Sequence, residues 1–276
     1  MKRQDLIKVL AEYGIQPSKA KGQNFLVDKN MLDAMVRGLN LTSGERVLEV
    51  GPGAGVLTRI IIEAGCQLTS VETDVKLHKY LTENLVAPNF ELVFGDACRV
   101  DYRKIFEPGE KFRCIANLPY AISSVFIAKM LDLETPPTEM YFLLQKEMAE
   151  RFSAKVDTKK YGSLTVRAGA MYDSKILRTV PPGVFHPPPK VDSAWIHMKQ
   201  KEIIPESTVL KVLNKLVRAA FSQRRKKAKK LISQQFPSDL VSSIYISMDL
   251  DEGIRAENLS IEQYVEFAKK LLEGSK

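Results

Sequence analysis

The segment from residue 45 to residue 65 constrains the fold more than any other part of the chain. It reads ERVLEVGPGAGVLTRIIIEAG, which is a short apolar run, a turn with three glycines, and apolar residues at helical spacing that stop at Gly65. A strand, a tight turn and a helix in this order open an α/β pattern. This segment therefore sets the expected fold class.

The same alternation continues along the next hundred residues. Strand patterns recur at 67–73, 90–95, 112–116 and 138–145, and helical patterns fall between them at 75–86, 123–132 and 146–154. Such alternation predicts a mostly parallel, doubly wound sheet covered on both faces. The polar segment 155–162 is predicted to be a mobile loop. Two further strands, 174–180 and 191–200, flank a proline-rich loop, which suits an antiparallel sheet edge.

The character of the sequence changes after Gln200. Only helical patterns follow, at 207–221, 223–235, 238–247 and 261–273. With 276 residues and 45% hydrophobic composition, the chain is long enough for one large domain and a smaller one. We expect an α/β domain with an N-terminal arm over residues 1–203 and a small all-helical domain over residues 204–276.

Composition indicates the cellular location of the protein and the charge of its binding partner. The first residues are charged, no secretory signal is evident, and no uninterrupted apolar run reaches eighteen residues, so we expect a cytoplasmic protein. The three cysteines and three histidines are scattered without metal-ligand spacing, and no metal is expected. A net charge of +8 and a pI near 9.2 favour a polyanionic partner.

The glycine turn indicates a ligand site but does not identify the ligand alone. Gly51, Gly53 and Gly55 follow the first strand, where they allow the backbone to approach a ligand closely. A dinucleotide fingerprint would have glycine or alanine where this chain has Val56. Taken alone, the motif is as consistent with a simple strand-to-helix turn as with a ligand site.

Polar residues at the ends of three further strands strengthen the case for a ligand. Glu72 closes the second strand, Asp96 follows the third and Asn117 follows the fourth. In an open α/β sheet these ends face one crevice, together with Gly51 and Gly53. Glu72 could hold ribose hydroxyls and Asp96 an adenine amino group, and no Lys or Arg directly follows the glycines to bind phosphate. These features predict S-adenosyl-L-methionine as the cofactor.

The tetrapeptide Asn117-Leu118-Pro119-Tyr120 predicts methylation of an exocyclic amine. The lone pair of an adenine amino group is delocalised into the ring, so two hydrogen-bond acceptors are needed to localise it. The Asn117 side-chain oxygen and the carbonyl of Leu118 or Pro119 could supply them, while Tyr120 stacks on the base. Phe185 is a candidate second wall for an extruded base, and ordinary core packing is the alternative for this residue.

A basic run predicts contact with RNA. Residues 223–230 read QRRKKAKK, and the expected phosphate-binding side chains are Arg224, Arg225, Lys226 and Lys227. A solvated charged helix is the alternative for this run. The segment Lys19-Ala20-Lys21 could add to the same interaction.

A longer series of motifs resembles the ribosomal RNA adenine dimethyltransferases. In chain order these are QNFL, VLEVGPGAGVLT, ETD, GDA, NLPYAISS, QKEMAER, YGSLTV and FHPPPKVDSA, which cover most of residues 20–200. AAFSQRRK, residues 219–226, resembles the C-terminal signature of the KsgA type, which dimethylates two adjacent adenines in a hairpin loop near the 3′ end of small-subunit ribosomal RNA. The chain departs from the family pattern at KKAKKLI and at Val125.

The resemblance implies more than the residues alone. It implies a Rossmann-like methyltransferase domain followed by a helical RNA-binding domain. It also implies that Asn24 and Leu26 help to close the cofactor site. A monomer acting on the immature small ribosomal subunit is the expectation.

Three other functions share part of this pattern. The first is a large-subunit ribosomal RNA adenine methyltransferase that confers antibiotic resistance. The second is a non-catalytic RNA-binding assembly factor or transcription factor on the same fold. The third is a DNA adenine methyltransferase, which the motifs flanking Asn117–Tyr120 disfavour.

Overall fold

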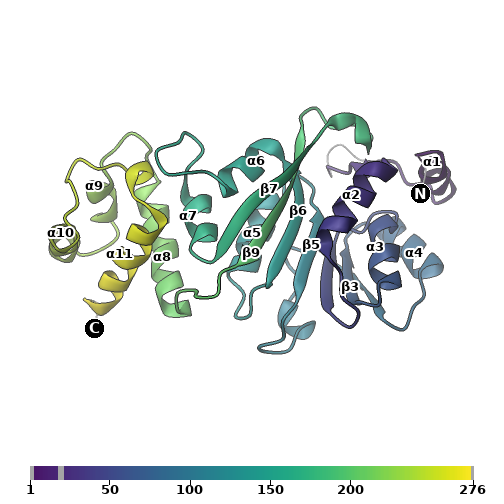
Figure 1. The fold of residues 1–276 in the computed structure, drawn as a ribbon, viewed down its shortest axis with the longest axis horizontal. Coiled ribbons are helices and arrows are strands. Elements are labelled where there is room, and N and C mark those ends of the chain that lie inside the picture. Colours follow the sequence, from purple (N-terminus) through teal and green to yellow (C-terminus); the bar gives the residue numbers. More distant parts are fainter. Residues whose placement is uncertain (1–2, 18–21, 275–276) are drawn as a thin grey trace. The chain divides into compact units, whose positions relative to one another are not determined.

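The computed structural model describes residues 3–17 and 22–274. Within these ranges, seven strands form one sheet in the order β4-β3-β2-β5-β6-β9-β7, and β1 pairs with β8 in a second, two-stranded sheet (Figure 1). The strands span β1 Phe25–Leu26, β2 Arg46–Val50, β3 Gln67–Glu72, β4 Phe90–Phe94, β5 Arg113–Asn117, β6 Glu139–Gln145, β7 Tyr172–Val180, β8 Phe185–His186 and β9 Ser193–Gln200.

Helices connect most of the strands and make up the C-terminal part of the chain. The α-helices span α1 Arg3–Glu12, α2 Lys29–Leu39, α3 Val56–Glu63, α4 Val75–Asn84, α5 Ser123–Leu131, α6 Lys146–Phe152, α7 Ser163–Gly169, α8 Ser207–Ala220, α9 Ala228–Ile232, α10 Ser238–Ser247 and α11 Ile261–Glu273.

The centre of the large sheet is parallel, as the alternation of patterns predicts. Strand β2 pairs in parallel with β3 and β5, β3 pairs with β4, and β5 pairs with β6. Strands β2, β3 and β5 are buried at nearly every position, as expected for strands with helices on both faces. The predicted Rossmann-like α/β fold is confirmed.

Two apolar layers cover the two faces of this sheet. On one face, Met35 and Leu39 of α2 pack with Leu143 of β6 in a buried cluster. On the other face, the Phe126 ring of α5 meets the Phe142 ring of β6 edge-on, at 6.0 Å between centroids. Because Phe142 and Leu143 are adjacent residues of one strand, their side chains necessarily point to opposite faces.

Most predicted elements are present, and one basic helix is shorter than expected. The pattern at 223–235 predicts a helix, but α9 occupies only Ala228–Ile232, residues 222–226 form bends and turns, and Lys227 forms an antiparallel bridge with Arg255. This correction has an electrostatic reason, since a helix through these residues would bring five consecutive polar or basic side chains, QRRKK, close together without an acidic partner at i+4. The helices α1, α2 and α7 were not anticipated.

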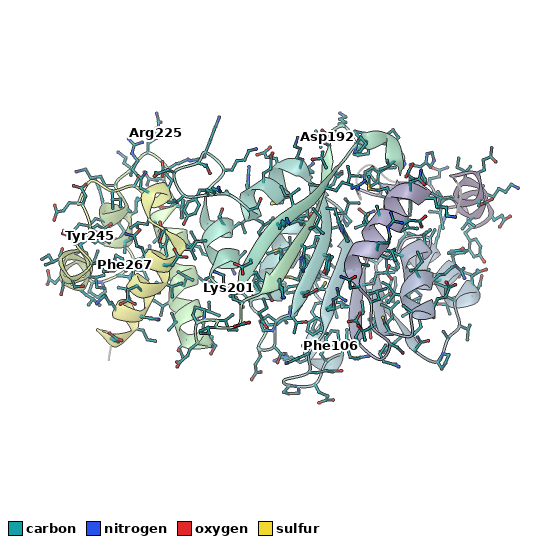
Figure 2. All side chains as sticks on the ribbon, viewed as in Figure 1. Phe106, Asp192, Lys201, Arg225, Tyr245 and Phe267 are labelled. Carbon is teal, nitrogen blue, oxygen red and sulfur yellow. The ribbon has the colours of Figure 1, made fainter. Side chains whose placement is uncertain are left out.

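The chain folds into two compact units. The first comprises residues 1–149 and 175–198, and the second comprises residues 150–174 and 199–276. The second unit therefore includes α7, which the sequence analysis placed in the first domain, because α7 packs on α8 and the Arg167 guanidinium donates to Asn214 Oδ1 at 2.6 Å. Tyr245 and Phe267, labelled in Figure 2, pack edge to face inside this unit.

One feature of the fold bears on membranes. Over residues 3–17 and 22–274, none of the helices has the length and apolar character needed to span a bilayer.

Gly55, which precedes α3, should not tolerate a side chain. Its φ is +73°, and a Cβ there would lie 2.8 Å from Leu85 Cδ1 and 2.9 Å from Leu81 Cδ2. We expect Gly55→Ala to lower the free energy of unfolding by about 2 kcal/mol or more, from left-handed strain and the clash together. Denaturant unfolding followed by circular dichroism measures this change.

The matched control is Gly38→Ala in α2. Gly38 has no atom within 4 Å of the added Cβ and no positive φ, so alanine should raise stability by about 0.5 kcal/mol. Equal effects of the two substitutions on the midpoint would contradict the assignment of strain to Gly55.

Candidate active site

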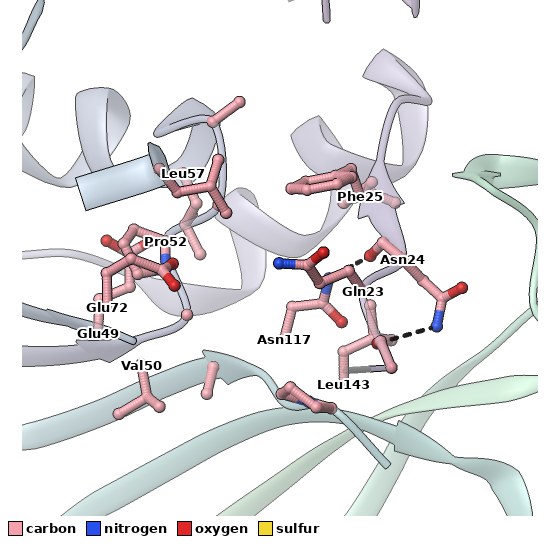
Figure 3. A pocket seen from close by; sticks show the side chains of 18 of the residues that line it. Gln23, Asn24, Phe25, Glu49, Val50, Pro52, Leu57, Glu72, Asn117 and Leu143 are labelled. Atoms are coloured by element: carbon pink, nitrogen blue, oxygen red, sulfur yellow. Dashed lines mark hydrogen bonds between the residues drawn. The ribbon is translucent and has the colours of Figure 1, made fainter. Parts of the chain in front are cut away.

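A cavity opens at the carboxyl edge of the parallel strands in the first unit. Its volume is about 340 Å³, and it is lined by the loops after β2, β3, β4 and β5 and by the N-terminal segment 22–27 (Figure 3). The size lies within the range of small-molecule sites in proteins. Parallel pairing explains the position, because it places four strand ends at one edge.

The structure brings together every residue that was predicted to hold the cofactor. All seven line this cavity, namely Asn24, Leu26, Gly51, Gly53, Glu72, Asp96 and Asn117. Of the four other residues expected to act on the substrate, Pro119 lines the cavity too. Leu118, Tyr120 and Phe185 lie outside its lining.

Gly53 allows two segments that are distant in the sequence to meet. Its φ is +59°, and a Cβ there would lie 3.1 Å from Phe25 Cδ1. Phe25 belongs to β1, which follows Asn24. A glycine at position 53 therefore lets the N-terminal segment close over the turn after β2.

Glu72 presents a buried carboxylate at the end of β3. The side chain is 5% exposed, and its Oε1 accepts the backbone N–H of Asp74 at 2.8 Å. Burial raises the pKa of Glu72 above its ordinary value, although backbone N–H groups of Asp74, Thr73 and Gly53 act in the opposite direction. The remaining lone pairs of this carboxylate are available to hydroxyl groups of a ligand.

The Asp96 carboxylate accepts a hydrogen bond within its own turn and also lines the cavity. Its Oδ1 accepts the backbone N–H of Cys98 at 2.8 Å, and its Oδ2 lies 3.5 Å from Arg99 Nε. The carboxylate therefore caps the turn after β4, as isolated Asp residues often do. Each oxygen has a second lone pair, so the cap leaves acceptor capacity on the cavity side.

The orientation of the Asn117 amide follows from its hydrogen bond to Asn24. Asn117 Nδ2 donates to the backbone carbonyl of Asn24 at 2.9 Å (Figure 3). A carbonyl only accepts, so the nitrogen of the amide must face Asn24 and the oxygen must face away. The side-chain oxygen of Asn117 is thereby left as a fixed acceptor at the cavity.

The two backbone carbonyls that follow Asn117 differ in their partners. The Pro119 carbonyl accepts both the backbone N–H of Ile122 at 3.1 Å and the hydroxyl of Ser123 at 3.2 Å. A carbonyl oxygen has two lone pairs, and both are engaged here. Among the described residues, none donates to the Leu118 carbonyl. Of the two alternatives that the sequence left open, the Leu118 carbonyl is the one that no described residue engages, although Leu118 itself does not line the cavity.

Phe185 is placed in the core rather than at the cavity. It is 3% exposed and packs in the same buried cluster as Met35, Leu143 and Trp195. Its strand, β8, pairs with β1 through Leu26. Ordinary core packing, which was the alternative for Phe185, is therefore what the structure shows. Through the pairing of β8 with β1, Phe185 helps to hold the N-terminal strand in place.

Two acceptor or donor groups in the site were missed by the sequence analysis. Glu49, the fourth of the five residues of β2, is 2% exposed and lines the cavity. Its Oε2 accepts the hydroxyls of Thr58 and Ser70, each at 2.8 Å. Gln23 also lines the cavity, and its Nε2 donates to Asp74 Oδ2 at 3.4 Å. Glu49 could have been recognised from the sequence, because it is an acidic residue within a largely apolar strand.

The cavity is acidic, and this fits a cationic ligand. Glu49, Glu72 and Asp96 line it, whereas its described lining contains neither Lys nor Arg. Burial raises the pKa of Glu49 to about 7, against the effect of its two hydroxyl partners. Carboxylates in a poorly solvated site favour positive charge and disfavour phosphate. Within residues 3–17 and 22–274, His, Cys, Asp and Glu side chains form no group of three that could hold a metal.

The predicted RNA-binding residues lie in the second unit. Arg224, Arg225, Lys226 and Lys227 are all exposed, and Figure 2 shows Arg225 directed outward. The Arg224 guanidinium donates to the backbone carbonyl of Lys159, which ties this turn to the loop that precedes α7. Residues 19–21 lie outside the described part of the chain.

Comparison with known proteins assigns the chain to a family. The family model of ribosomal RNA adenine dimethylases matches residues 16–273. The chain belongs to this family. The matched range includes the glycine turn, the acidic residues at the strand ends and the helical C-terminal part.

Curated relatives of this dimethylase extend over almost the whole chain. "Ribosomal RNA small subunit methyltransferase A" of Alkaliphilus oremlandii is 36% identical and covers 96% of this chain and 95% of its own length. The protein of the same name from Brucella abortus is 36% identical, with 97% of each chain covered.

Solved structures show the same fold. A dimethyladenosine transferase from Plasmodium falciparum superposes with a TM-score of 0.76 at 24% identity, over 91% of this chain and 97% of its own. The 23S rRNA methyltransferase ErmE superposes with a TM-score of 0.67 at 26% identity, over 90% of this chain and 99% of its own.

The burial of Glu49 should make the stability of the ligand-free dimethylase depend on pH. The carboxyl has a pKa of about 7 in the folded protein and its ordinary value of 4.5 when unfolded. Its stabilising contribution is therefore complete below pH 4.5 and is lost as the pH rises to 7. Glu49→Gln stays neutral and still accepts from Thr58 and Ser70, so we expect a higher melting temperature than wild type at pH 8 and a similar one at pH 5.

Thermal denaturation at the two pH values measures this difference. The control is Glu63→Gln, which changes an exposed carboxyl of α3 and should leave the melting temperature unaltered at both. A constant difference between Glu49→Gln and wild type from pH 5 to pH 8 would show that Glu49 does not titrate in this range.

Proposed function

We propose that this protein dimethylates the exocyclic N6 amino groups of two adjacent adenines in a hairpin loop near the 3′ end of small-subunit ribosomal RNA. The methyl donor is S-adenosyl-L-methionine. The observation that carries the proposal is the fixed amide of Asn117, whose side-chain oxygen accepts from none of the described residues and lies at an acidic cavity. Membership of the dimethylase family and relatives named for the small subunit support the choice of substrate.

The cavity suits the proposed donor through its charge. When bound, S-adenosyl-L-methionine would supply a methyl group on a positively charged sulfur for transfer to the adenine nitrogen, which would leave a neutral thioether, and the methylated amine would release a proton to water. Glu72 would hold the ribose hydroxyls and Asp96 the adenine amino group. Asn24 and Leu26 would close the site over the turn at Gly51. Glu49 adds a third carboxyl group to the lining of the cavity.

The residues after β5 prepare the target amine. The Asn117 side-chain oxygen accepts one N–H and the Leu118 carbonyl accepts the other. With both N–H bonds held, the nitrogen lone pair is directed out of conjugation with the ring. Both acceptors are positioned before the substrate arrives, so little reorganisation accompanies the reaction. Tyr120 stacks on the base, and Pro119 stiffens the loop.

The second unit provides the contact with RNA phosphates. Arg225, Lys226 and Lys227 are exposed on a turn, which lets them follow an irregular phosphate backbone. Arg224 has a different part, because it holds that turn against the loop that carries Lys159. The partner is the immature small ribosomal subunit, and the protein acts as a monomer in the cytoplasm.

A second candidate is methylation of large-subunit ribosomal RNA. The fold and 26% identity are shared with the 23S rRNA methyltransferase ErmE. The two functions use the same cavity chemistry, so they differ in the RNA that the enzyme accepts.

Nucleoside analysis of methylated ribosomal subunits separates these two functions. The purified protein is incubated with labelled S-adenosyl-L-methionine and either small or large subunits from cells that lack the activity. We expect labelled N6,N6-dimethyladenosine in small-subunit RNA alone. Label in large-subunit RNA alone would establish the second candidate, and label in neither would refute both.

Substitutions at Asn117 and Glu72 should separate turnover from cofactor binding. Asn117→Ala removes the acceptor for the amine and also the tie to Asn24, and we expect the methylation rate to fall about a thousandfold, a far larger change than that in the dissociation constant of the cofactor. Glu72→Ala should weaken cofactor binding at least about tenfold, because ligand hydroxyls lose a charged acceptor. Single-turnover rates measure the first effect.

Cofactor binding is measured by fluorescence of the single tryptophan, Trp195, which lines the cavity. Exposed Lys226→Ala is the control for the binding assay, since it lies outside the first unit. Methylation by Asn117→Ala at the wild-type rate would show that this amide does not hold the amine.

A further inference from the structure

Tyr120 is bonded to a strand that is distant from it in the sequence. Its hydroxyl lies 2.7 Å from Ser193 Oγ, a short and well-formed O–H···O hydrogen bond. Ser193 is the first residue of β9 and is 0% exposed, whereas Tyr120 is half-buried. The bond therefore joins a surface turn to the interior of the sheet.

Ser193 is a firm anchor because its own strand is fixed on both sides. Strand β9 lies between β6 and β7 in the large sheet. The residue before it is also held, since the Asp192 carbonyl accepts the backbone N–H of Lys146 at 3.0 Å. A hydroxyl at this position moves little relative to the carboxyl end of β6.

The bond completes the restraint of the loop after β5. Asn117 is tied to Asn24 through its amide, and the Pro119 carbonyl is tied to Ile122 and Ser123 at the start of α5. Neither contact restrains the Tyr120 ring, which rotates about two side-chain bonds. Fixing the phenol oxygen at one point removes rotation about Cα–Cβ and so sets the direction of the ring axis, while rotation about Cβ–Cγ is limited by the preference of a phenol hydrogen bond for the plane of the ring.

We propose that Ser193 is a positioning residue that holds the Tyr120 ring in the place required to stack on the target adenine. The proposal rests on the function proposed above and extends it to a residue on β9. Ser193 acts only through Tyr120 and does not touch the substrate. Burial raises the pKa of Tyr120, so the phenol keeps its proton at neutral pH and the hydrogen bond persists under assay conditions.

Loss of the serine hydroxyl should slow methylation without weakening cofactor binding. With Ser193→Ala, the ring samples orientations that do not match the base, and we expect kcat on small subunits to fall about tenfold. The dissociation constant of S-adenosyl-L-methionine, measured by equilibrium dialysis, should stay within about twofold, since Ser193 and Tyr120 do not line the cavity.

A second variant distinguishes positioning from a general loss of stability. Tyr120→Phe keeps the aromatic ring and removes only the phenol oxygen, so it should reproduce the loss seen with Ser193→Ala. The double variant should be no slower than either single one, because both remove the same bond. Additive losses would mean that the two hydroxyls act independently and would overturn the proposal, as would wild-type kcat in Ser193→Ala.

Thr138→Val is the matched control. Thr138 donates its hydroxyl to the Phe112 carbonyl at 3.2 Å, before the start of β6 and at the opposite edge of the sheet. This variant loses one hydroxyl hydrogen bond of the same sheet and should methylate at the wild-type rate. Failure of wild type to methylate small subunits would refute the proposed function instead, whereas an active wild type with an unaffected Ser193→Ala variant would refute this inference alone.

Discussion

Parallel pairing of β3, β2 and β5 is the constraint on which the site depends. In this arrangement the carboxyl ends of neighbouring strands lie at one edge, so Gly51, Glu72 and Asn117 are adjacent although up to 66 residues separate them in the sequence. The register keeps them level, since Val50 pairs with both Val71 and Ala116. A shift of one residue in any of these strands would turn its last side chain to the other face of the sheet.

The buried carboxylates of the cavity destabilise the empty protein but favour the binding of a cation. Glu49 and Glu72 are both buried, and desolvation raises the pKa of each, so the empty site disfavours the ionised state that a cationic ligand requires. The hydroxyls of Thr58 and Ser70 offset part of this cost at Glu49. A positively charged ligand would offset more of it, since it stabilises both carboxylates at once.

The sequence predicted the sheet and most of the site because both depend on local patterns. Apolar runs with β-branched residues mark strands such as β3 and β5, and the polar residue that ends each of them was enough to place Glu72 and Asn117. Hydrogen bonds between distant segments have no such signal. The tie from Asn117 to Asn24 and that from Tyr120 to Ser193 join residues 93 and 73 positions apart. The burial of Phe185 depends likewise on the pairing of β8 with β1.

Backbone contacts in the loop after β5 decide which of its oxygens can act on a substrate. The Pro119 carbonyl is the acceptor that helps to start α5, and the Asn117 nitrogen is the donor that holds Asn24. Among the described residues, none donates to the Asn117 side-chain oxygen or to the Leu118 carbonyl. The contacts that make this loop rigid therefore engage the Pro119 carbonyl and the Asn117 nitrogen and leave these two oxygens as acceptors.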